Sequence, residues 1–181
     1  YGLSDPTLEA EWPRYGPMRE GETSEETRLA YAALLTMCDE NLGRLLDTID
    51  ELDMWKDTVV MVGTDHGFLL GEREMMGKCR TPFYNETSHI PFFLWDPRIG
   101  AKGSTCEALC QTIDVTATVL DLFQLERPAD MQGRSVLGAI ERGAPVRDAA
   151  LFGQFGGHVN VTDGRYVLMI APQSVDGLFT Y

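Results

Sequence analysis

Residues 57–91, DTVVMVGTDHGFLLGEREMMGKCRTPFYNETSHIP, contain the features from which the fold is predicted. The run TVVMV at 58–62 is rich in β-branched residues, too short for a helix and not alternating in polarity, which is typical of a strand covered on both faces. A second apolar run, IPFFLW at 90–95, predicts another buried strand. Because such strands occur in sheets covered by helices, the stretch predicts an α/β fold.

A carboxylate and an imidazole directly follow the first of these strands. Asp65 and His66 lie in GTDHG at 63–67, past the carboxyl end of a strand, where open α/β sheets usually place their ligands. The carboxylate offers a hard anionic oxygen and the imidazole a neutral nitrogen, and Gly67 allows the backbone to turn closely behind them. We therefore predict that Asp65 and His66 bind a metal ion. The alternative is a polar strand end followed by a turn.

A lysine follows this pair at a distance that a loop can close. Lys78 lies thirteen residues after Asp65, beyond a loop that contains Gly71 and Gly77. An ammonium group near a divalent cation is repelled unless an anion lies between them. We therefore predict that Lys78 faces an anionic group such as sulfate or phosphate. The alternative is an ordinary lysine of a surface loop.

Four short motifs in this stretch, taken together in their order and spacing, resemble the sulfatase family within the alkaline phosphatase superfamily. They are GTDHG at 63–67, LGE at 70–72, GK at 77–78 and HIP at 89–91. The resemblance extends to the segments at 31–50, 112–114 and 132–135. It implies the C-terminal part of an alkaline-phosphatase-like sandwich, with a largely parallel or mixed central sheet and part of a small antiparallel subdomain after it.

The same resemblance implies a function, a sulfuric ester hydrolase acting on small-molecule or carbohydrate sulfate esters, as arylsulfatases do. Asp65 and His66 then match metal ligands, with Ca²⁺ as the implied divalent cation. Lys78 matches the lysine that contacts the transferred sulfuryl oxygens. The nucleophile of the family is a formylglycine made from Cys or Ser in a Cys-x-Pro-x-Arg setting, and no such motif occurs in the 181 residues. We therefore expect a fragment that lacks the N-terminal half of its own chain and is inactive alone.

One residue departs from the family pattern and keeps other functions open. Many sulfatases carry asparagine where this chain has His66, whereas phosphonate and phosphate-ester hydrolases of the superfamily often carry Asp-His. The first alternative is therefore a phosphonate or phosphate (di)ester hydrolase. The second is a non-catalytic, sulfatase-like remnant that folds and binds a partner.

Composition excludes several classes of partner. The chain has 15 Lys and Arg against 28 Asp and Glu, a formal charge of −13, which repels nucleic acid and anionic membranes. No stretch approaches the eighteen or more apolar residues of a membrane span. The sequence begins at Tyr1 rather than at an initiator methionine, so it does not indicate a compartment; periplasmic or secreted and cytoplasmic locations both stay open. The cysteines are predicted to be structural thiols, with disulfides as the alternative, at positions 38, 79, 106 and 110.

The rest of the chain predicts a main domain at 1–147 and an incomplete antiparallel subdomain at 148–181. Residues 1–22 are expected to form a loop, and a capping box at Thr23 and Glu26 predicts a long helix whose apolar stripe packs on the sheet. Helices are also predicted at 106–124 and 135–140, and strands at 150–153 and 166–170. Asp114 lies inside the helix at 106–124 and is given a structural role.

Overall fold

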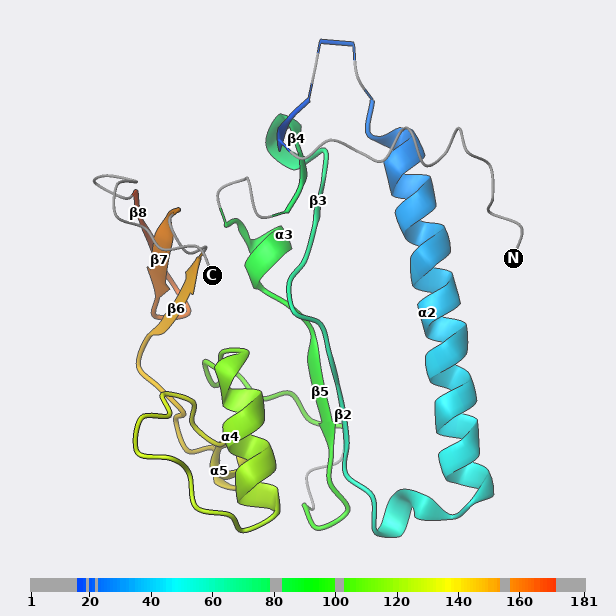
Figure 1. Ribbon diagram of the computed structural model, residues 1–181, viewed down its shortest axis with the longest axis vertical. Helices are drawn as coiled ribbons and strands as arrows, with labels where there is room; N and C mark the ends of the chain where they lie inside the picture. The colour runs from blue at the N-terminus through cyan, green and yellow to red at the C-terminus, as the bar shows by residue number, and fades with distance from the viewer. Residues whose placement is uncertain are drawn as a thin grey trace. The chain divides into compact units, whose positions relative to one another are not determined.

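The computed structural model describes residues 16–18, 20–21, 23–78, 83–99, 103–153 and 157–171. The chain forms two compact units, of which unit 1 ends at Leu94 and unit 2 begins at Trp95 (Figure 1). The expectations for residues 1–15 and for the segment 177–181 lie outside the described residues, and the predicted domain division at 147/148 stays a prediction.

The strands of unit 1 form two small sheets. β2 (Val60–Gly63) and β5 (Phe92–Trp95) overlap the two apolar runs that predict strands, and they pair with each other. The end of β2 meets the start of β5, because a Cβ on Gly63 would lie 3.3 Å from the Phe92 ring, and Figure 1 shows the chain passing through the two strands in opposite directions. β2 is not covered on both faces as predicted, because Val60, Met61 and Val62 are only half-buried and Gly63 is exposed.

The second sheet of unit 1 brings the segment after β2 back on itself. β3 (Leu69–Leu70) and β4 (Met75–Gly77) form an antiparallel hairpin that turns at η2 (Glu72–Glu74). β1 (Gly16–Pro17) pairs with the other edge of β4, so the segment predicted as loop contains a short strand. Leu69 is fully buried and Met76 is 3% exposed. These two side chains therefore anchor the hairpin.

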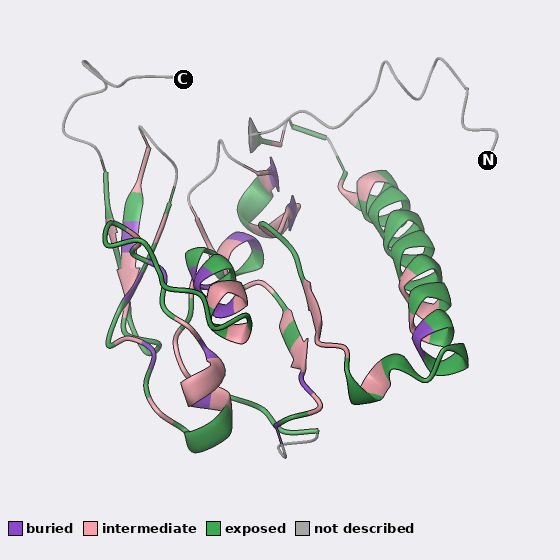
Figure 2. Cartoon of the chain, turned by 60° about the horizontal axis from the view of Figure 1, so that its bottom comes forward, coloured by how far each residue is buried: buried purple, intermediate pink, exposed green. Residues whose placement is uncertain are grey.

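The long helix of unit 1 is α2 (Glu25–Glu51), which leads through the short turn η1 (Met54–Lys56) to β2. The predicted capping box does not form, since the N-cap is Ser24 without a side-chain cap and this serine packs against Gly71. The predicted packing of the apolar stripe is wrong too: Ile49 is the buried residue of α2, while Leu35 is 61% exposed (Figure 2).

Unit 2 begins with the end of β5 and contains two helices, α4 (Ile113–Leu122) and α5 (Leu137–Arg142). The helix predicted at 106–124 is shorter at its start because Gln111 makes other bonds. Its backbone N–H donates to Asp114 Oδ2 at 2.7 Å, and its side-chain amide donates to the carbonyl of Leu151 at 2.7 Å. The segment before α4 is thereby joined to the following sheet instead of to another helical turn.

The sheet of unit 2 is three-stranded and antiparallel. β6 (Ala150–Gly153), β7 (Val159–Thr162) and β8 (Val167–Ile170) pair in sequence order. The prediction of strands at 150–153 and 166–170 is confirmed, whereas β7, the central strand, was not predicted. Ala150 and Asn160 are buried on one face. The chain is thus a mixed α/β protein with small antiparallel sheets, and a larger central sandwich stays a prediction.

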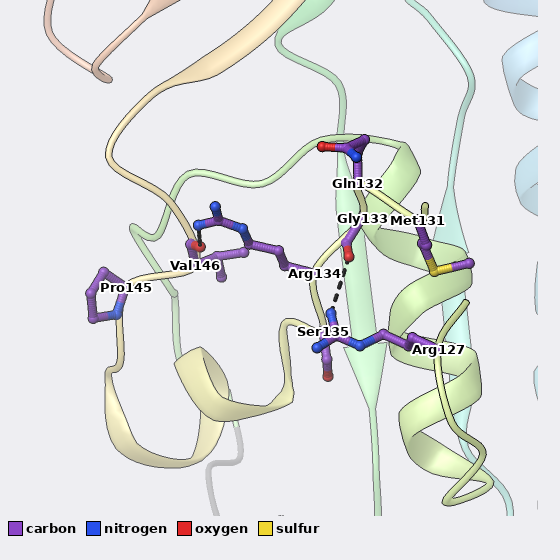
Figure 3. Close-up of a pocket in the computed structure, with 8 residues that line it drawn as sticks. All are labelled: Arg127, Met131, Gln132, Gly133, Arg134, Ser135, Pro145 and Val146. Carbon is purple, nitrogen blue, oxygen red and sulfur yellow. Dashed lines mark hydrogen bonds between the residues drawn. The ribbon is translucent and has the colours of Figure 1, made fainter. Parts of the chain in front are cut away.

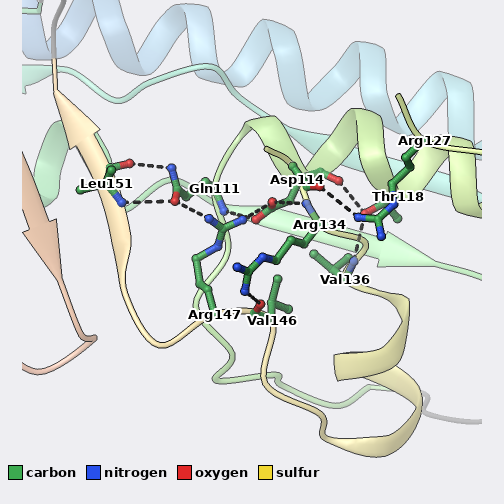
Figure 4. A network of polar contacts seen from close by, with 10 residues as sticks. Gln111, Asp114, Thr118, Arg127, Arg134, Val136, Val146, Arg147 and Leu151 are labelled. Atoms are coloured by element: carbon green, nitrogen blue, oxygen red, sulfur yellow. Dashed lines mark hydrogen bonds and ion pairs between the residues drawn. The ribbon is translucent and has the colours of Figure 1, made fainter. Parts of the chain in front are cut away.

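A buried carboxylate holds unit 2 together (Figure 4). Asp114, 1% exposed, accepts hydrogen bonds from the backbone N–H groups of Gln111 and Arg134 at 2.7 and 2.8 Å and forms an ion pair with Arg147. The Gln111 side-chain oxygen accepts from Arg147 and from the N–H of Leu151. Asp114 therefore connects α4, the loop after it and β6, which agrees with its predicted structural role.

Candidate functional site

The predicted acid and imidazole lie in the loop that leaves β2. One carboxylate oxygen of Asp65, Oδ1, accepts a hydrogen bond from the backbone N–H of His66 at 3.0 Å and lies 3.3 Å from the Thr64 hydroxyl, which can donate to it. The other oxygen, Oδ2, lies 3.3 Å from His66 Nε2. The Asp65 side chain is 80% exposed, while that of His66 is 28% exposed. The loop therefore fixes one oxygen of the acid and leaves the other facing the imidazole.

The hairpin brings the predicted lysine to the same point. Leu69 of β3 pairs with Gly77 of β4, so the residue after Gly77 returns to the loop that precedes β3. Lys78 is that residue, and its Nζ lies 2.8 Å from His66 Nε2. The spacing of thirteen residues between Asp65 and Lys78 is thus closed by an antiparallel turn. The structure brings all three predicted site residues together.

The hydrogen bonds of His66 define which ring nitrogen has a lone pair. Nδ1 lies 2.9 Å from the carbonyl of Gly67, and a carbonyl can only accept, so Nδ1 carries the hydrogen. An ammonium can only donate, so the contact with Lys78 requires a lone pair on Nε2. The Nε2 lone pair therefore accepts the hydrogen of Lys78, and Asp65 Oδ2 lies 3.3 Å from the same nitrogen.

A cation fits between these two atoms. Ligands at about 2.1–2.4 Å from one ion and at right angles are separated by about 3.0–3.4 Å, and the Oδ2 to Nε2 distance is 3.3 Å. Desolvation raises the pKa of Asp65, whereas the positive charge of a protonated His66 ring, the His66 backbone N–H and the Thr64 hydroxyl lower it, so that this pKa lies below its ordinary value. Within the described residues no third His, Cys, Asp or Glu completes a metal cluster.

The loop is held from behind by the short helix α3 (Asn85–Ser88). The N–H of Gly67 donates to the carbonyl of Thr87 at 2.9 Å, and the N–H of Phe68 donates to that of Glu86 at 3.2 Å. A Cβ on Gly67 would lie 1.9 Å from the Glu86 carbonyl oxygen. The predicted close turn of the backbone at Gly67 is therefore confirmed, and the contact that requires it is α3.

An arginine that sequence reasoning missed fixes α3 in turn. Arg73 Nη1 lies 3.0 and 3.1 Å from the two carboxylate oxygens of Glu86, and its guanidinium lies 3.9 Å from the ring centroid of Tyr84. Both Arg73 and Glu74 have a left-handed backbone, with φ of 53° and 58°. The sequence carries no signal for these contacts, because Arg73 lies more than ten residues from Tyr84 and Glu86. The left-handed backbone at Arg73 and Glu74 is not predicted either, since neither residue is glycine, the usual left-handed residue.

Unit 2 contains a hollow of about 480 Å³ that none of the predicted site residues lines (Figure 3). Its two arginines donate to backbone carbonyls, Arg127 to Gly133 at 3.1 Å and Arg134 to Val146 at 2.9 Å. The hollow is lined by Arg127, Met131, Gln132, Gly133, Arg134, Ser135, Pro145 and Val146. These arginines therefore stabilise the loop after α4, and we assign no ligand to this hollow.

Known proteins resemble the chain in sequence and in fold. A multifunctional alkaline phosphatase superfamily protein of Trinickia caryophylli is 34% identical over 128 residues, which cover 70% of this chain and 24% of that protein. The structure of BT4656 in complex with its substrate D-glucosamine-2-N,6-O-disulfate matches with a TM-score of 0.64 and 27% identity, over 72% of this chain and 28% of that one. A phosphonate monoester hydrolase of Silicibacter pomeroyi matches with a TM-score of 0.66 and 25% identity, over 77% and 31%. The class defined by the fold and these likenesses is the alkaline phosphatase superfamily.

The family within this class follows from a direct match. The sulfatase family model matches residues 4–125, more than half of the sequence. The chain belongs to the sulfatase family, and the resemblance seen in the motifs at 63–91 is confirmed. The chain spans about a quarter of the length of the curated relatives it matches, 24%, 20% and 27% for three of them.

No described helix combines the length and the apolar character that crossing a membrane requires. The prediction that the chain has no membrane span agrees with this result for the part of the chain that the structure describes.

Proposed function

We propose that this chain forms part of the active site of a cation-dependent hydrolase of sulfate esters. Asp65 and His66 hold a divalent cation, and Lys78 binds the anionic ester. The family match supports the reaction class, and the likeness to a protein bound to a disulfated glucosamine favours a carbohydrate sulfate among the substrates.

The proposal rests on one observation: a carboxylate and an ammonium group lie close to the same imidazole nitrogen. Asp65 Oδ2 and Lys78 Nζ both lie within 3.3 Å of His66 Nε2. A carboxylate and a ring lone pair attract a cation, while the ammonium attracts an anion. A site that combines them suits a substrate with negatively charged oxygens, which a cation and a lysine can bind from two sides.

When bound, the cation would polarise the ester oxygen and stabilise negative charge that develops during the reaction. The residues of the chain do the remaining work. Gly67 and α3 keep the ligand loop in place, and the hairpin directs Lys78 toward the substrate. The family resemblance favours Ca²⁺; because an imidazole also suits transition metals, Mn²⁺ and Zn²⁺ belong in the same test.

The nucleophile is assigned to a segment outside these 181 residues, since they contain no Cys-x-Pro-x-Arg motif or its serine counterpart. The proposed nucleophile is formylglycine. The second candidate is hydrolysis of phosphonate or phosphate esters, which His66 and the likeness to a phosphonate monoester hydrolase favour. A remnant without catalysis is the third, and it predicts that cations bind no better to the chain than to an Asp65→Ala variant.

The test has two parts. The chain alone is expected to hydrolyse no 4-nitrophenyl sulfate, and measurable turnover would overturn the assignment of the nucleophile. In a protein that joins these residues to a nucleophile-bearing portion, Asp65→Ala or Lys78→Met is expected to lower kcat for the sulfate by about 10²–10³. The control is Asp47→Ala on the exposed side of α2, which should leave kcat unchanged. Faster turnover of a phenyl phosphonate monoester than of the sulfate would favour the second candidate.

A further inference from the structure

Two of the proposed roles depend on a single lone pair. Lys78 Nζ lies 2.8 Å from His66 Nε2 and donates a hydrogen bond to it. Asp65 Oδ2 lies 3.3 Å from the same nitrogen, and the Nε2 lone pair is the one that would bind the cation. Since an imidazole nitrogen has one lone pair in the ring plane, it cannot accept from the lysine and bind a metal at the same time.

We propose that Lys78 and the divalent cation compete for His66 Nε2, so that cation binding releases Lys78 to the anionic substrate. The inference rests on the proposed function and adds the order in which the cation and the anion bind. The cation binds first and the anion second, and each strengthens the binding of the other.

The surroundings of Lys78 favour this exchange. Among the described residues no carboxylate forms an ion pair with Lys78, and its hydrogen-bond partner is the imidazole. The carboxylate of Asp65, which lies 3.3 Å from Nε2, would hold the cation, so a lysine displaced from Nε2 stays available for an anionic substrate. A doubly charged cation at Nε2 also repels the ammonium, and an anion that contacts both removes this repulsion.

Lys78 must stay close after it is displaced. It follows β4 directly, and the pairing of Gly77 with Leu69 fixes its backbone beside the ligand loop. The flexible side chain can then rotate away from Nε2 while its Cα stays in place. The exchange therefore needs a change of side-chain rotamer and no movement of the hairpin.

The first experiment measures cation binding to the 181-residue chain by calorimetry, with CaCl₂ and MnCl₂ and without sulfate. Lys78→Met removes the donor and keeps an unbranched side chain that is one heavy atom shorter. We expect the cation to bind this variant about 10- to 100-fold more tightly than the wild type, because no charge-assisted hydrogen bond has to be broken. The matched control is Lys56→Met, which removes an exposed lysine paired with Asp53 and should change the affinity less than twofold.

The second experiment adds sodium sulfate at constant ionic strength. In the wild type, saturating sulfate is expected to tighten cation binding, and saturating cation should tighten sulfate binding by the same factor. In Lys78→Met this factor should be about tenfold smaller, because only the cation then contacts the anion. An equal factor in the two proteins would overturn the release of Lys78.

The third measurement observes the hydrogen bond directly. Long-range ¹H–¹⁵N spectra of the histidine rings, recorded without cation, should show a change at His66 Nε2 on Lys78→Met and none on Lys56→Met. An unchanged resonance, or equal cation affinities of wild type and Lys78→Met, would overturn the competition alone. Absence of cation binding to every variant would overturn the cation site of the proposed function and the competition with it.

Discussion

Replacement of Asp114 by asparagine is the sharpest test of what stabilises unit 2. The substitution keeps the shape of the side chain and removes its charge. Arg147, 10% exposed, then loses its only carboxylate partner in the described part of the chain. Its Nε is buried and already lacks a hydrogen-bond partner there, so the neutral side-chain oxygen of Gln111 is the partner that remains for the guanidinium. We expect the variant to fold with much lower stability.

The magnitude follows from burial. Removing one partner of a buried ion pair costs about 3–5 kcal/mol, because an uncompensated charge stays inside the protein. Asp114 also accepts hydrogen bonds from the backbone N–H groups of Gln111 and Arg134, one on each oxygen. The asparagine keeps one acceptor oxygen, so one of these N–H groups faces an amide donor instead. The expected loss in free energy of unfolding is therefore at the upper end, about 4–5 kcal/mol.

The assay is urea unfolding followed by circular dichroism and tryptophan fluorescence. Asp121→Asn, an exposed position on α4, is the matched control and should stay within about 0.5 kcal/mol of the wild type. The double variant Asp114→Leu with Arg147→Met should be more stable than either single variant, since it leaves no charge buried. A loss below about 1 kcal/mol for Asp114→Asn, or additive losses in the double variant, would refute this account of unit 2.

Two further predictions concern pH and the ligand loop. The side-chain hydrogen bond from Arg98 lowers the pKa of the buried Asp96. The wild type should therefore exceed Asp96→Asn in stability above about pH 5 and lose this advantage as the pH falls below about 3.9; a pH-independent difference in Tm between the two proteins would contradict the pairing. Gly67→Ala should displace the loop, because its Cβ would lie 1.9 Å from the Glu86 carbonyl oxygen. Calorimetry should then show cation binding weakened at least tenfold, which corresponds to about 1.4 kcal/mol. Gly43→Ala on α2, with open space around its Cβ, should instead stabilise the chain by about 0.5–1 kcal/mol. If Gly67→Ala stabilised the chain by the same amount, the close approach at Gly67 would be contradicted.

Local sequence patterns predict four of the strands that the structure describes, β2, β5, β6 and β8, and miss β1, β3, β4 and β7. The apolar run at 58–62 overlaps β2 at Val60–Gly63, and the strand at 150–153 coincides with β6. Both runs are short, β-branched or apolar, and bounded by turn residues. Such patterns depend on neighbouring residues alone, so they can be read without the partner strand.

Patterns that depend on distant partners predict less. The spacing of apolar residues correctly predicts the long helix α2 but not its burial, because burial needs a second layer and the pattern does not say whether one is present. The helix at 106–124 was predicted too long because Gln111 bonds to Leu151, forty residues away. A local pattern contains no information about such a bond.

The candidate site was likewise predicted only in part: the sequence predicted its binding residues but not the residues that support them. Asp65, His66 and Lys78 are side chains with charge or a lone pair, and their motif and spacing made them candidates. The structure places them together, while their binding roles stay predictions. The support behind them was not predicted, because Arg73 and Glu86 look like ordinary surface charges in the sequence. Only the folded loop shows that they hold α3 against the ligand segment.

The exposed middle of α2 has a consequence for hydrogen exchange. The helix, 27 residues and so about 40 Å long, is held near its start by the bond from Arg28 to the Leu70 carbonyl and near its end by the buried Ile49. All ten residues at 32–41 are exposed. Amides in this middle segment should therefore exchange with solvent deuterium about as fast as those of an isolated helix, while the slowest amides lie toward the two ends, the reverse of ordinary helix fraying.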